Sequence, residues 1–149
     1  MGQWAVDATA SSTYQNATGQ TSYSPWQATG APNVSSFGDN GNAWTSKESD
    51  AGIEWLQVKF AKPVHATEIR VRQTLGAGSI IKVELIDDQG TLHTVFEGMD
   101  DTKYPANSIV WFIRAFNRTD YTVTSAKITL ATNMVHGWNE IDAVQLLGE

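Results

Sequence analysis

Apolar and polar residues alternate along most of the chain in short runs. Val, Ile, Thr and aromatic residues recur in these runs, and Gly, Asn, Asp and Pro lie between them, which is typical of strands joined by turns. Where Ile69 and Val71 alternate with Arg70 and Arg72, one face of a strand is expected to be buried and the other exposed to water. No segment shows a sustained period of 3.6 residues. The pattern therefore predicts an all-β chain.

The runs predict eight strands. Two of them flank the turn Asp87-Asp-Gln-Gly90 and predict a hairpin. Short strands of this number and patterning predict an eight-stranded antiparallel β-sandwich, or jelly roll. The predicted strands are Trp4–Ser11, Trp55–Phe60, Thr67–Thr74, Ile80–Ile86, Thr91–Phe96, Ile109–Ala115, Thr122–Leu130 and Ile141–Leu147.

The stretch from Ser12 to Ser49 has a different composition. It is rich in Ser, Gly, Asn, Thr and Ala, and it carries five aromatic residues, namely Tyr14, Tyr23, Trp26, Phe37 and Trp44. Because an irregular linker of this length is uncommon inside one domain, we expect an ordered functional loop.

Length and charge restrict the classes of function. A chain of 149 residues, 41% of them hydrophobic, is expected to form one domain over residues 1–149. It has no cysteine, so disulfides and thiolate metal sites are excluded. The net charge of −6 argues against nucleic acid as a partner, and no apolar run is long enough to predict a transmembrane segment. We expect Met1 and Gly2 to be the edge of a piece of a longer protein, with any signal peptide outside this sequence.

Three sequence signatures occur in order along the chain. They are Gly38-Asp-Asn-Gly-Asn-Ala-Trp-Thr-Ser46, Glu54-Trp-Leu-Gln-Val-Lys-Phe60 and the closing run from Gly137 to Gly148. Together they resemble the discoidin, or coagulation factor 5/8 type C, group of galactose-binding-like β-sandwiches, which includes many bacterial carbohydrate-binding modules. The resemblance covers nearly the whole chain. The family's frequent cysteine pair is absent, and Asn42 stands where the family has Thr.

The resemblance implies a structural calcium ion between the acidic loop and the last strand. Asp39 and Glu140 would supply carboxylate oxygens, and Asn33, Asn42 and loop carbonyls would complete the six to eight oxygen ligands that calcium prefers. The alternative is that Asp39 only caps a turn by accepting hydrogen bonds from backbone N–H groups.

An exposed aromatic ring surrounded by polar groups is the expected form of a sugar site. The favoured cluster is Trp138 with His136 and Asn139, just before the last strand, and the alternative is that this trio anchors a loop. Trp26 and Tyr23 lie in predicted loops, where binding residues concentrate, and are further candidates.

Other residues have both a binding and a structural interpretation. By resemblance, Arg72 and Gln73 stand where sugar-binding relatives carry an arginine, although Arg72 suits a surface ion pair equally well. The tryptophans in predicted strands, and Trp44 by resemblance, are expected to lie in the core. The strand tryptophans are Trp4, Trp55 and Trp111.

Catalysis has little support in the sequence. Glu140 and Asp142 share a strand face, as a glycosidase pair would, but they lie on a closing strand and not beside a cleft. We therefore predict that the domain is not an enzyme.

The predicted function is a non-catalytic carbohydrate-binding module that targets a larger secreted or surface protein to a glycan, at an extracellular or cell-surface location. The alternatives are a discoidin-like adhesion domain, which binds protein or membrane surfaces, and a structural accessory domain.

Overall fold

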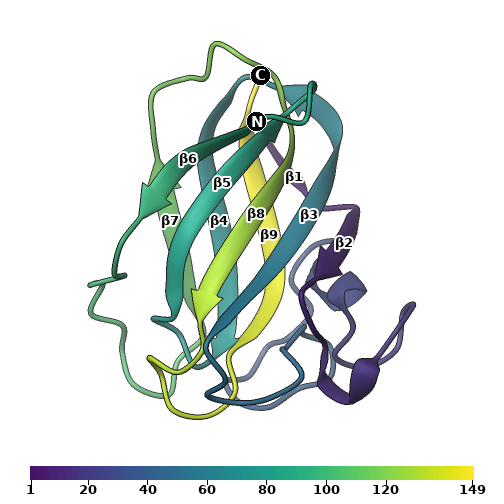
Figure 1. Ribbon diagram of the computed structural model, residues 1–149, viewed down its shortest axis with the longest axis vertical. Helices are drawn as coiled ribbons and strands as arrows, with labels where there is room; N and C mark the ends of the chain where they lie inside the picture. The colour runs from purple at the N-terminus through teal and green to yellow at the C-terminus, as the bar shows by residue number, and fades with distance from the viewer.

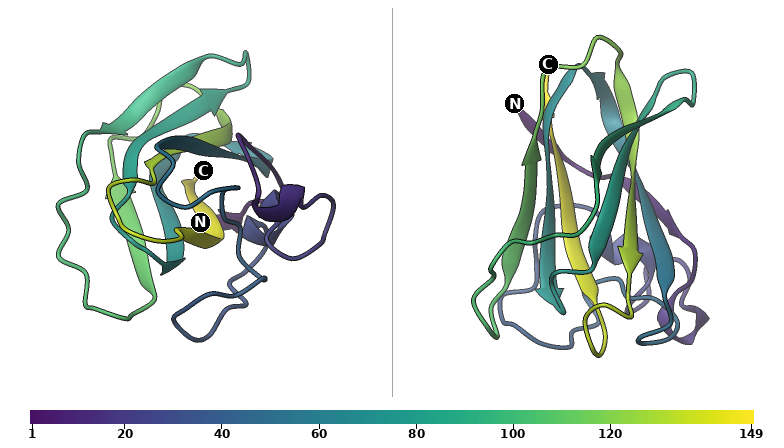
Figure 2. Two further views of the ribbon diagram at one scale, coloured as in Figure 1. Left: turned by 60° about the horizontal axis from the view of Figure 1, so that its bottom comes forward. Right: turned by 60° about the vertical axis from the view of Figure 1, so that its left-hand side comes forward.

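Two antiparallel sheets face each other in the computed structural model, which describes residues 1–149 (Figure 1; Figure 2, right). One sheet has the strand order β1-β9-β4-β7, and the other has the order β2-β3-β8-β5-β6. The predicted all-β sandwich is confirmed. The strands are β1 (Gly2–Trp4), β2 (Asp7–Ala10), β3 (Ile53–Val64), β4 (Ala66–Leu75), β5 (Ile80–Asp87), β6 (Leu92–Glu97), β7 (Val110–Ala115), β8 (Val123–Ala131) and β9 (Glu140–Gly148).

The structure has nine strands where the sequence predicted eight, because the first predicted strand is divided between the two sheets. The Ala5 N–H donates to the Val144 carbonyl of β9 at 3.0 Å, and the next N–H, of Val6, donates to the Lys59 carbonyl of β3 at 2.8 Å. Successive backbone groups of a strand point in opposite directions. The chain therefore passes from one sheet to the other between these two residues.

The hydrophobic core lies between the sheets. Ile69 and Val71 of β4 are fully buried and the intervening Arg70 is partly exposed, as the alternating pattern predicted. The predicted hairpin β5–β6 is confirmed, and Asp87 Oδ1 closes its turn by accepting the N–H groups of Gln89 and Thr91. The largest fully buried apolar side chains are Trp44, Phe112, Leu56, Ile69, Ile80, Leu85, Ile128, Leu130, Ile141 and Leu146.

The prediction that the strand tryptophans lie in the core is wrong. Trp4, Trp55 and Trp111 are all partly exposed. Trp4 and Trp111 pack together on the outside of the four-stranded sheet with ring centroids 6.1 Å apart, and the Lys127 ammonium lies 5.1 Å from the Trp55 ring. The alternation of each strand directs its aliphatic residues inward, so these large rings cover the outer faces of the sheets.

Trp44 is the one fully buried tryptophan, as the resemblance implied. It forms an antiparallel bridge with Ile141 of β9, in which each residue's N–H donates to the other's carbonyl, and its indole N–H donates to the Ser12 carbonyl at 3.2 Å. These bonds hold the long segment after β2 against one end of the sandwich. Its two short helical turns are η1 (Tyr14–Asn16) and η2 (Pro25–Ala28), and neither is long or apolar enough to cross a membrane.

Trp44→Ala tests this anchor. We expect the free energy of unfolding to fall by about 3 to 5 kcal/mol, because the substitution leaves a cavity in the core and removes the indole hydrogen bond. The matched control Trp26→Ala removes a tryptophan that is 41% exposed and is expected to cost about 0.5 kcal/mol or less. Urea denaturation followed by circular dichroism measures both, and equal losses would contradict the assigned role of Trp44.

Candidate functional site

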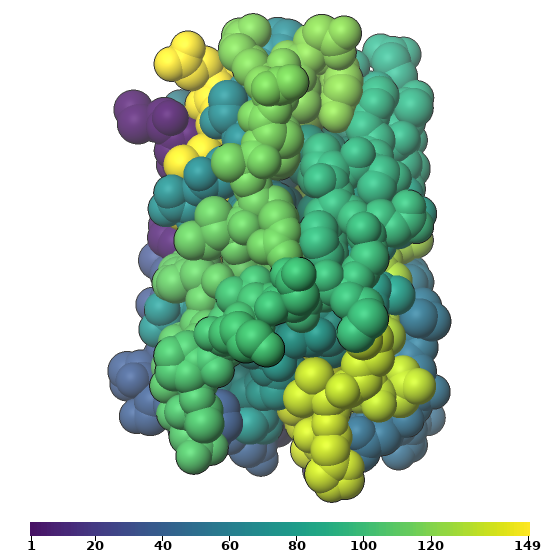
Figure 3. Space-filling model, turned by 90° about the vertical axis from the view of Figure 1, so that its left-hand side faces the viewer, coloured from purple at the N-terminus to yellow at the C-terminus, as the bar shows by residue number.

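Most irregular segments of the chain gather at one end of the sandwich, opposite the two termini (Figure 1; Figure 2, right). This loop end combines the segment after β2 with the β4–β5 and β8–β9 connections. The β8–β9 connection projects at the lower end of the molecule in Figure 3. Gly76 of the β4–β5 connection has φ +67° and passes so close to Trp138 that a Cβ atom there would collide with the Trp138 carbonyl.

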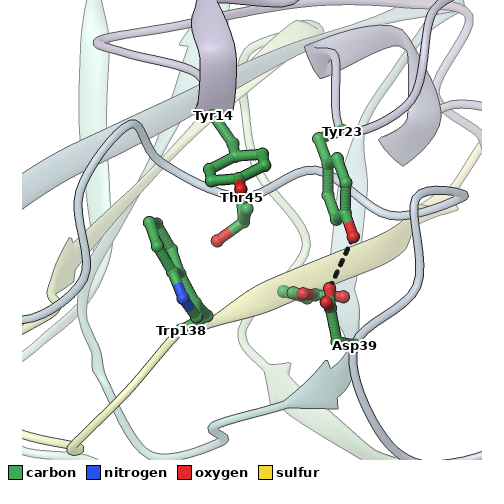
Figure 4. A pocket seen from close by; sticks show the side chains of 6 residues that line it. Tyr14, Tyr23, Asp39, Thr45 and Trp138 are labelled. Carbon is green, nitrogen blue, oxygen red and sulfur yellow. Dashed lines mark hydrogen bonds between the residues drawn. The ribbon is translucent and has the colours of Figure 1, made fainter.

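Three aromatic rings surround a small pocket at the loop end (Figure 4). The Tyr14 ring lies edge-on to both Tyr23 and Trp138, with centroids 5.1 Å apart in each pair. Thr45, Asp39 and Glu140 complete the lining of a cavity of about 40 Å³. A bound water needs about 10–15 Å³ of such space. The pocket therefore has room for a few waters or an ion, and a sugar ring would have to lie on the aromatic rim.

Two carboxyl groups meet at the pocket floor. The Tyr23 hydroxyl donates to Asp39 Oδ1 at 2.7 Å, and the Asn40 N–H donates to Glu140 Oε1 at 2.9 Å. Burial, reinforced by the adjacent Asp39, raises the pKa of Glu140 to about 8. The hydrogen bond to Asp39, together with burial, raises the pKa of Tyr23 to about 12. The floor therefore favours a neutral Glu140 unless a cation offsets the paired negative charge.

One carboxylate oxygen of the pocket floor has no hydrogen-bond partner. Glu140 lines the pocket, and its Oε2 is buried and unpaired. Buried polar atoms normally have a partner. Glu140 Oε2 is therefore a place for a bound water or an ion.

Asp142 lies on β9 two residues from Glu140 but binds different groups. It accepts the Asn33 and Val34 N–H groups, each at 3.2 Å, and its Oδ2 lies 3.5 Å from Arg72 Nε. Burial raises the pKa of Asp142, while these partners oppose the shift. Glu140 and Asp142 therefore bind two different parts of the long segment after β2 and do not flank a common cleft.

The structure brings only part of the predicted sugar-binding set together. Trp138 and Tyr23 line the pocket, and Asn139 lies buried beneath it. The His136 side chain is 99% exposed and lies 3.4 Å from Asp50. Trp26 lines a different cavity, on the other side of the segment that follows β2.

Arg72 and Gln73 also lie away from the aromatic rim. The Arg72 guanidinium lies 5.5 Å from the centre of the Trp111 ring, donates to the Val34 carbonyl and pairs with Asp142. Gln73 is 2% exposed. The ion-pair interpretation of Arg72 therefore describes its observed contacts.

Of the four predicted metal ligands, three lie at or near the pocket floor, whereas Asn33 binds elsewhere. Asp39 and Glu140 are adjacent, and Asn42 belongs to the same turn as Asp39, with its N–H donating to Asn40 Oδ1 at 2.9 Å. The Asn33 amide donates instead to Asp142 Oδ1 at 2.9 Å and to the Asn42 carbonyl at 3.3 Å. No three His, Asp or Glu side chains gather closely enough to hold a metal ion by themselves.

Sequence reasoning missed Tyr14 and Thr45 as pocket residues. Tyr14 was visible only as one of several aromatic residues in the long loop. Thr45 follows the buried Trp44 and is positioned by donating to the Asn139 carbonyl at 2.9 Å. Neither position carries a local sequence signal for binding.

Glu140→Gln tests the electrostatics of the pocket floor in the metal-free protein. A raised carboxyl pKa means that the folded state keeps a proton that the unfolded state loses between about pH 4.5 and 8, so stability falls as pH rises through this window. The slope is at most about 1.4 kcal/mol per pH unit. The neutral amide removes this dependence, so the variant should gain stability relative to the wild type as pH rises. Urea denaturation in EDTA at several pH values measures the difference, and parallel profiles would contradict the raised pKa.

Comparisons with known proteins identify relatives of this architecture. The family described as "Pappalysin-1, SD scarf domain, C-terminal" matches residues 1–149. A comparison with curated proteins finds no match.

Similar solved structures share the fold over nearly their whole length. Chitosan-binding module 1 of a chitosanase/glucanase from Paenibacillus sp. IK-5 is 14% identical, with a TM-score of 0.69 and coverage of 95% of this chain and 94% of that chain. The family 32 carbohydrate-binding module of C. perfringens NanJ, solved with galactose, is 15% identical, with a TM-score of 0.65 and 98% of each chain covered. The corresponding module of AlyQ, solved with 4,5-unsaturated mannuronic acid, is 18% identical, with a TM-score of 0.61 and coverage of 99% of this chain and 98% of that chain.

These similarities show the galactose-binding-like, discoidin-type fold that the sequence signatures resembled. The family match extends over the full chain. The chain belongs to the family of the C-terminal SD scarf domain of pappalysin-1.

Proposed function

We propose that this domain is a non-catalytic carbohydrate-binding module whose ligand lies on the aromatic rim of the loop-end pocket. The observation that carries the proposal is the cluster of Tyr14, Tyr23 and Trp138 around a polar floor. The fold shared with modules described as chitosan-binding or solved with galactose supports it.

The rim suits a sugar because it combines stacking surfaces with hydrogen-bonding groups. The apolar C–H face of a sugar ring packs on an indole or phenol ring, and its hydroxyls bind polar groups at the edge. Asp39 is exposed and accepts hydrogen bonds, and the Thr45 hydroxyl also faces the pocket. Such an open site makes few contacts, so we expect a dissociation constant in the millimolar to micromolar range, about −4 to −8 kcal/mol.

The position of the site agrees with a role in attaching a larger protein to a glycan. Both chain ends lie at the end of the sandwich opposite the loops (Figure 1). Domains joined there would leave the aromatic rim free. We therefore propose that the domain belongs to a multimodular protein outside the cell or on its surface, where several weak modules bind a glycan with higher combined affinity.

We also propose a structural calcium ion at the pocket floor. Asp39 and Glu140 provide adjacent carboxylates, the cavity has room for an ion, and Glu140 Oε2 is buried without a partner. Backbone carbonyls of the turn that contains Asn42 would complete the coordination. Asn33 contributes indirectly at most, since its amide binds Asp142 and the Asn42 carbonyl. The ion would offset the paired negative charge and hold the acidic loop to β9.

A structural accessory domain is the second candidate function. An apolar hollow of about 610 Å³ lies at the end with the chain termini, lined in part by Met1, Trp4, Val6, Pro63 and Val64. Apolar surface of this kind is often covered by a neighbouring domain. Protein that is folded but binds no glycan would favour this function over carbohydrate binding.

Trp138→Ala tests the proposed sugar site. A glycan array probed in calcium and again in EDTA identifies a ligand, and calorimetry then compares the variants with the wild type. We expect Trp138→Ala to weaken binding by about tenfold or more, because it removes the largest stacking ring of the rim, while Trp138→Phe retains part of the affinity. Trp55→Ala removes a partly exposed tryptophan from the outer face of the five-stranded sheet, away from the loop-end pocket, and should leave binding at the rim unchanged. Unaltered affinity in folded Trp138→Ala protein would place the site elsewhere.

Calcium should raise the melting temperature of the wild-type domain by several degrees, because the ion binds the folded state only. Asp39→Asn and Glu140→Gln should each abolish most of this increase by removing a carboxylate ligand. Asp88→Asn, in the exposed turn at the opposite end, is the matched control and should behave as the wild type. Thermal melts with calcium and with EDTA make the comparison. Identical melts of the wild type in both conditions would refute the calcium proposal.

A further inference from the structure

A second and larger hollow lies beside the edge strand β2. It occupies about 520 Å³ between β2 and the segment that runs from Thr13 to Trp26, and it shares no lining residue with the loop-end pocket. Figure 1 shows β2 and this segment at the border of the five-stranded sheet. We call this hollow the β2 groove. Its volume is in the range of ligand sites and far exceeds that of the loop-end pocket.

The far wall of the β2 groove is held in place by a buried glutamine. Gln27, 9% exposed, donates from its side-chain nitrogen to the carbonyls of Gln20 and Thr21, at 3.1 Å each. These bonds tie the wall to η2, which carries Trp26. The groove is therefore a formed feature of the fold, and its aromatic ring has a defined position.

The lining combines one exposed aromatic ring with neutral hydrogen-bonding groups. Trp26 is 41% exposed and lies beside Pro25. Thr9, Thr18 and Gln20 also line the groove, and none of their side chains is hydrogen-bonded within the protein. Small residues, Ala8, Ala10, Ala17 and Gly19, leave room over the floor. An indole face with free hydroxyl and amide groups is the chemistry that binds a neutral sugar.

A smaller hollow borders the β2 groove at β2. It has a volume of about 150 Å³, shares Asp7, Ala8 and Thr9 with the groove and adds Gln57, Lys59 and Ser125. Of the lining residues of both hollows only Asp7 and Lys59 are charged, and their charges are opposite. The lining therefore suits a neutral ligand better than a charged one.

We propose that the β2 groove is a binding site for the internal part of a neutral oligosaccharide chain, with Trp26 as its stacking platform. This site is separate from the loop-end rim. It would bind several consecutive sugar units of a glycan, whereas the rim would bind a single unit. Two sites on different sides of one segment would let the domain contact a polysaccharide at two places.

Nuclear magnetic resonance of the ¹⁵N-labelled domain tests the proposal. The six tryptophan indole signals are assigned with single variants, and the protein is titrated with hexasaccharides of β-1,4-linked glucose, N-acetylglucosamine, mannose and xylose, with the matching monosaccharides, and with hexagalacturonate as a charged probe. We expect at least one neutral hexasaccharide to shift the Trp26 signal and to bind more tightly than its monosaccharide. Trp26→Ala should weaken this binding by about tenfold or more, and Gln20→Ala by about threefold.

Gln89→Ala is the matched control, since Gln89 is exposed in the β5–β6 turn at the other end of the sandwich, and it should have no effect. Hexasaccharide binding that shifts Trp138 and persists in Trp26→Ala would support the loop-end site alone and overturn this proposal. Preference for hexagalacturonate would overturn the assignment of a neutral ligand. The absence of any shift at Trp26 with all the neutral hexasaccharides would overturn the site itself. This outcome is also the one expected if the edge of β2 pairs with an extended peptide and not with a sugar.

Discussion

The backbone bridge between Trp44 and Ile141 is the constraint on which the functional end of this domain depends. It joins a segment of about forty residues without strands to β9, which is the last strand of the chain and lies within the four-stranded sheet. Fixing so long a segment is costly in conformational entropy. A fully buried indole, two backbone hydrogen bonds and the bond to Ser12 offset that cost at one point. Tyr14, Asp39 and Thr45 then reach the pocket from the same anchored segment.

Two buried carboxyl groups extend this attachment along β9. Glu140 accepts the Asn40 N–H, and Asp142 accepts the N–H groups of Asn33 and Val34. Each carboxyl thus orders a different part of the long loop. The two differ in the charge that surrounds them, because Asp142 has Arg72 nearby whereas Glu140 faces another carboxylate. Burial and this adjacent carboxylate raise the pKa of Glu140, whereas Arg72 opposes the shift at Asp142.

The segment from Thr13 to Trp26 separates the two candidate binding surfaces. Tyr14 and Tyr23 face the loop-end pocket, whereas Trp26 faces the β2 groove. The small pocket is suited to ordering the loop and presenting an aromatic rim, and the larger groove has the volume for a ligand. One ordered segment therefore gives the domain aromatic surfaces on two sides, while the opposite end of the sandwich carries both termini (Figure 1).

The sequence by itself determined the all-β class, the places of seven of the strands and the inward direction of residues such as Ile69 and Val71, because the two-residue period of a strand is a local property. The signatures around Trp44 and Glu140 also indicated the fold family. Only the tertiary structure decided that the first strand divides at Ala5 and Val6, since that depends on which partner strand is nearest. Likewise, the sequence favoured Trp138 over Trp26 and grouped His136 with Asn139, but only the structure showed that the two tryptophans line different hollows and that His136 is exposed whereas Asn139 is buried. Whether such a side chain faces a pocket, solvent or the core is set by contacts between residues far apart in the chain, and no local pattern encodes those contacts.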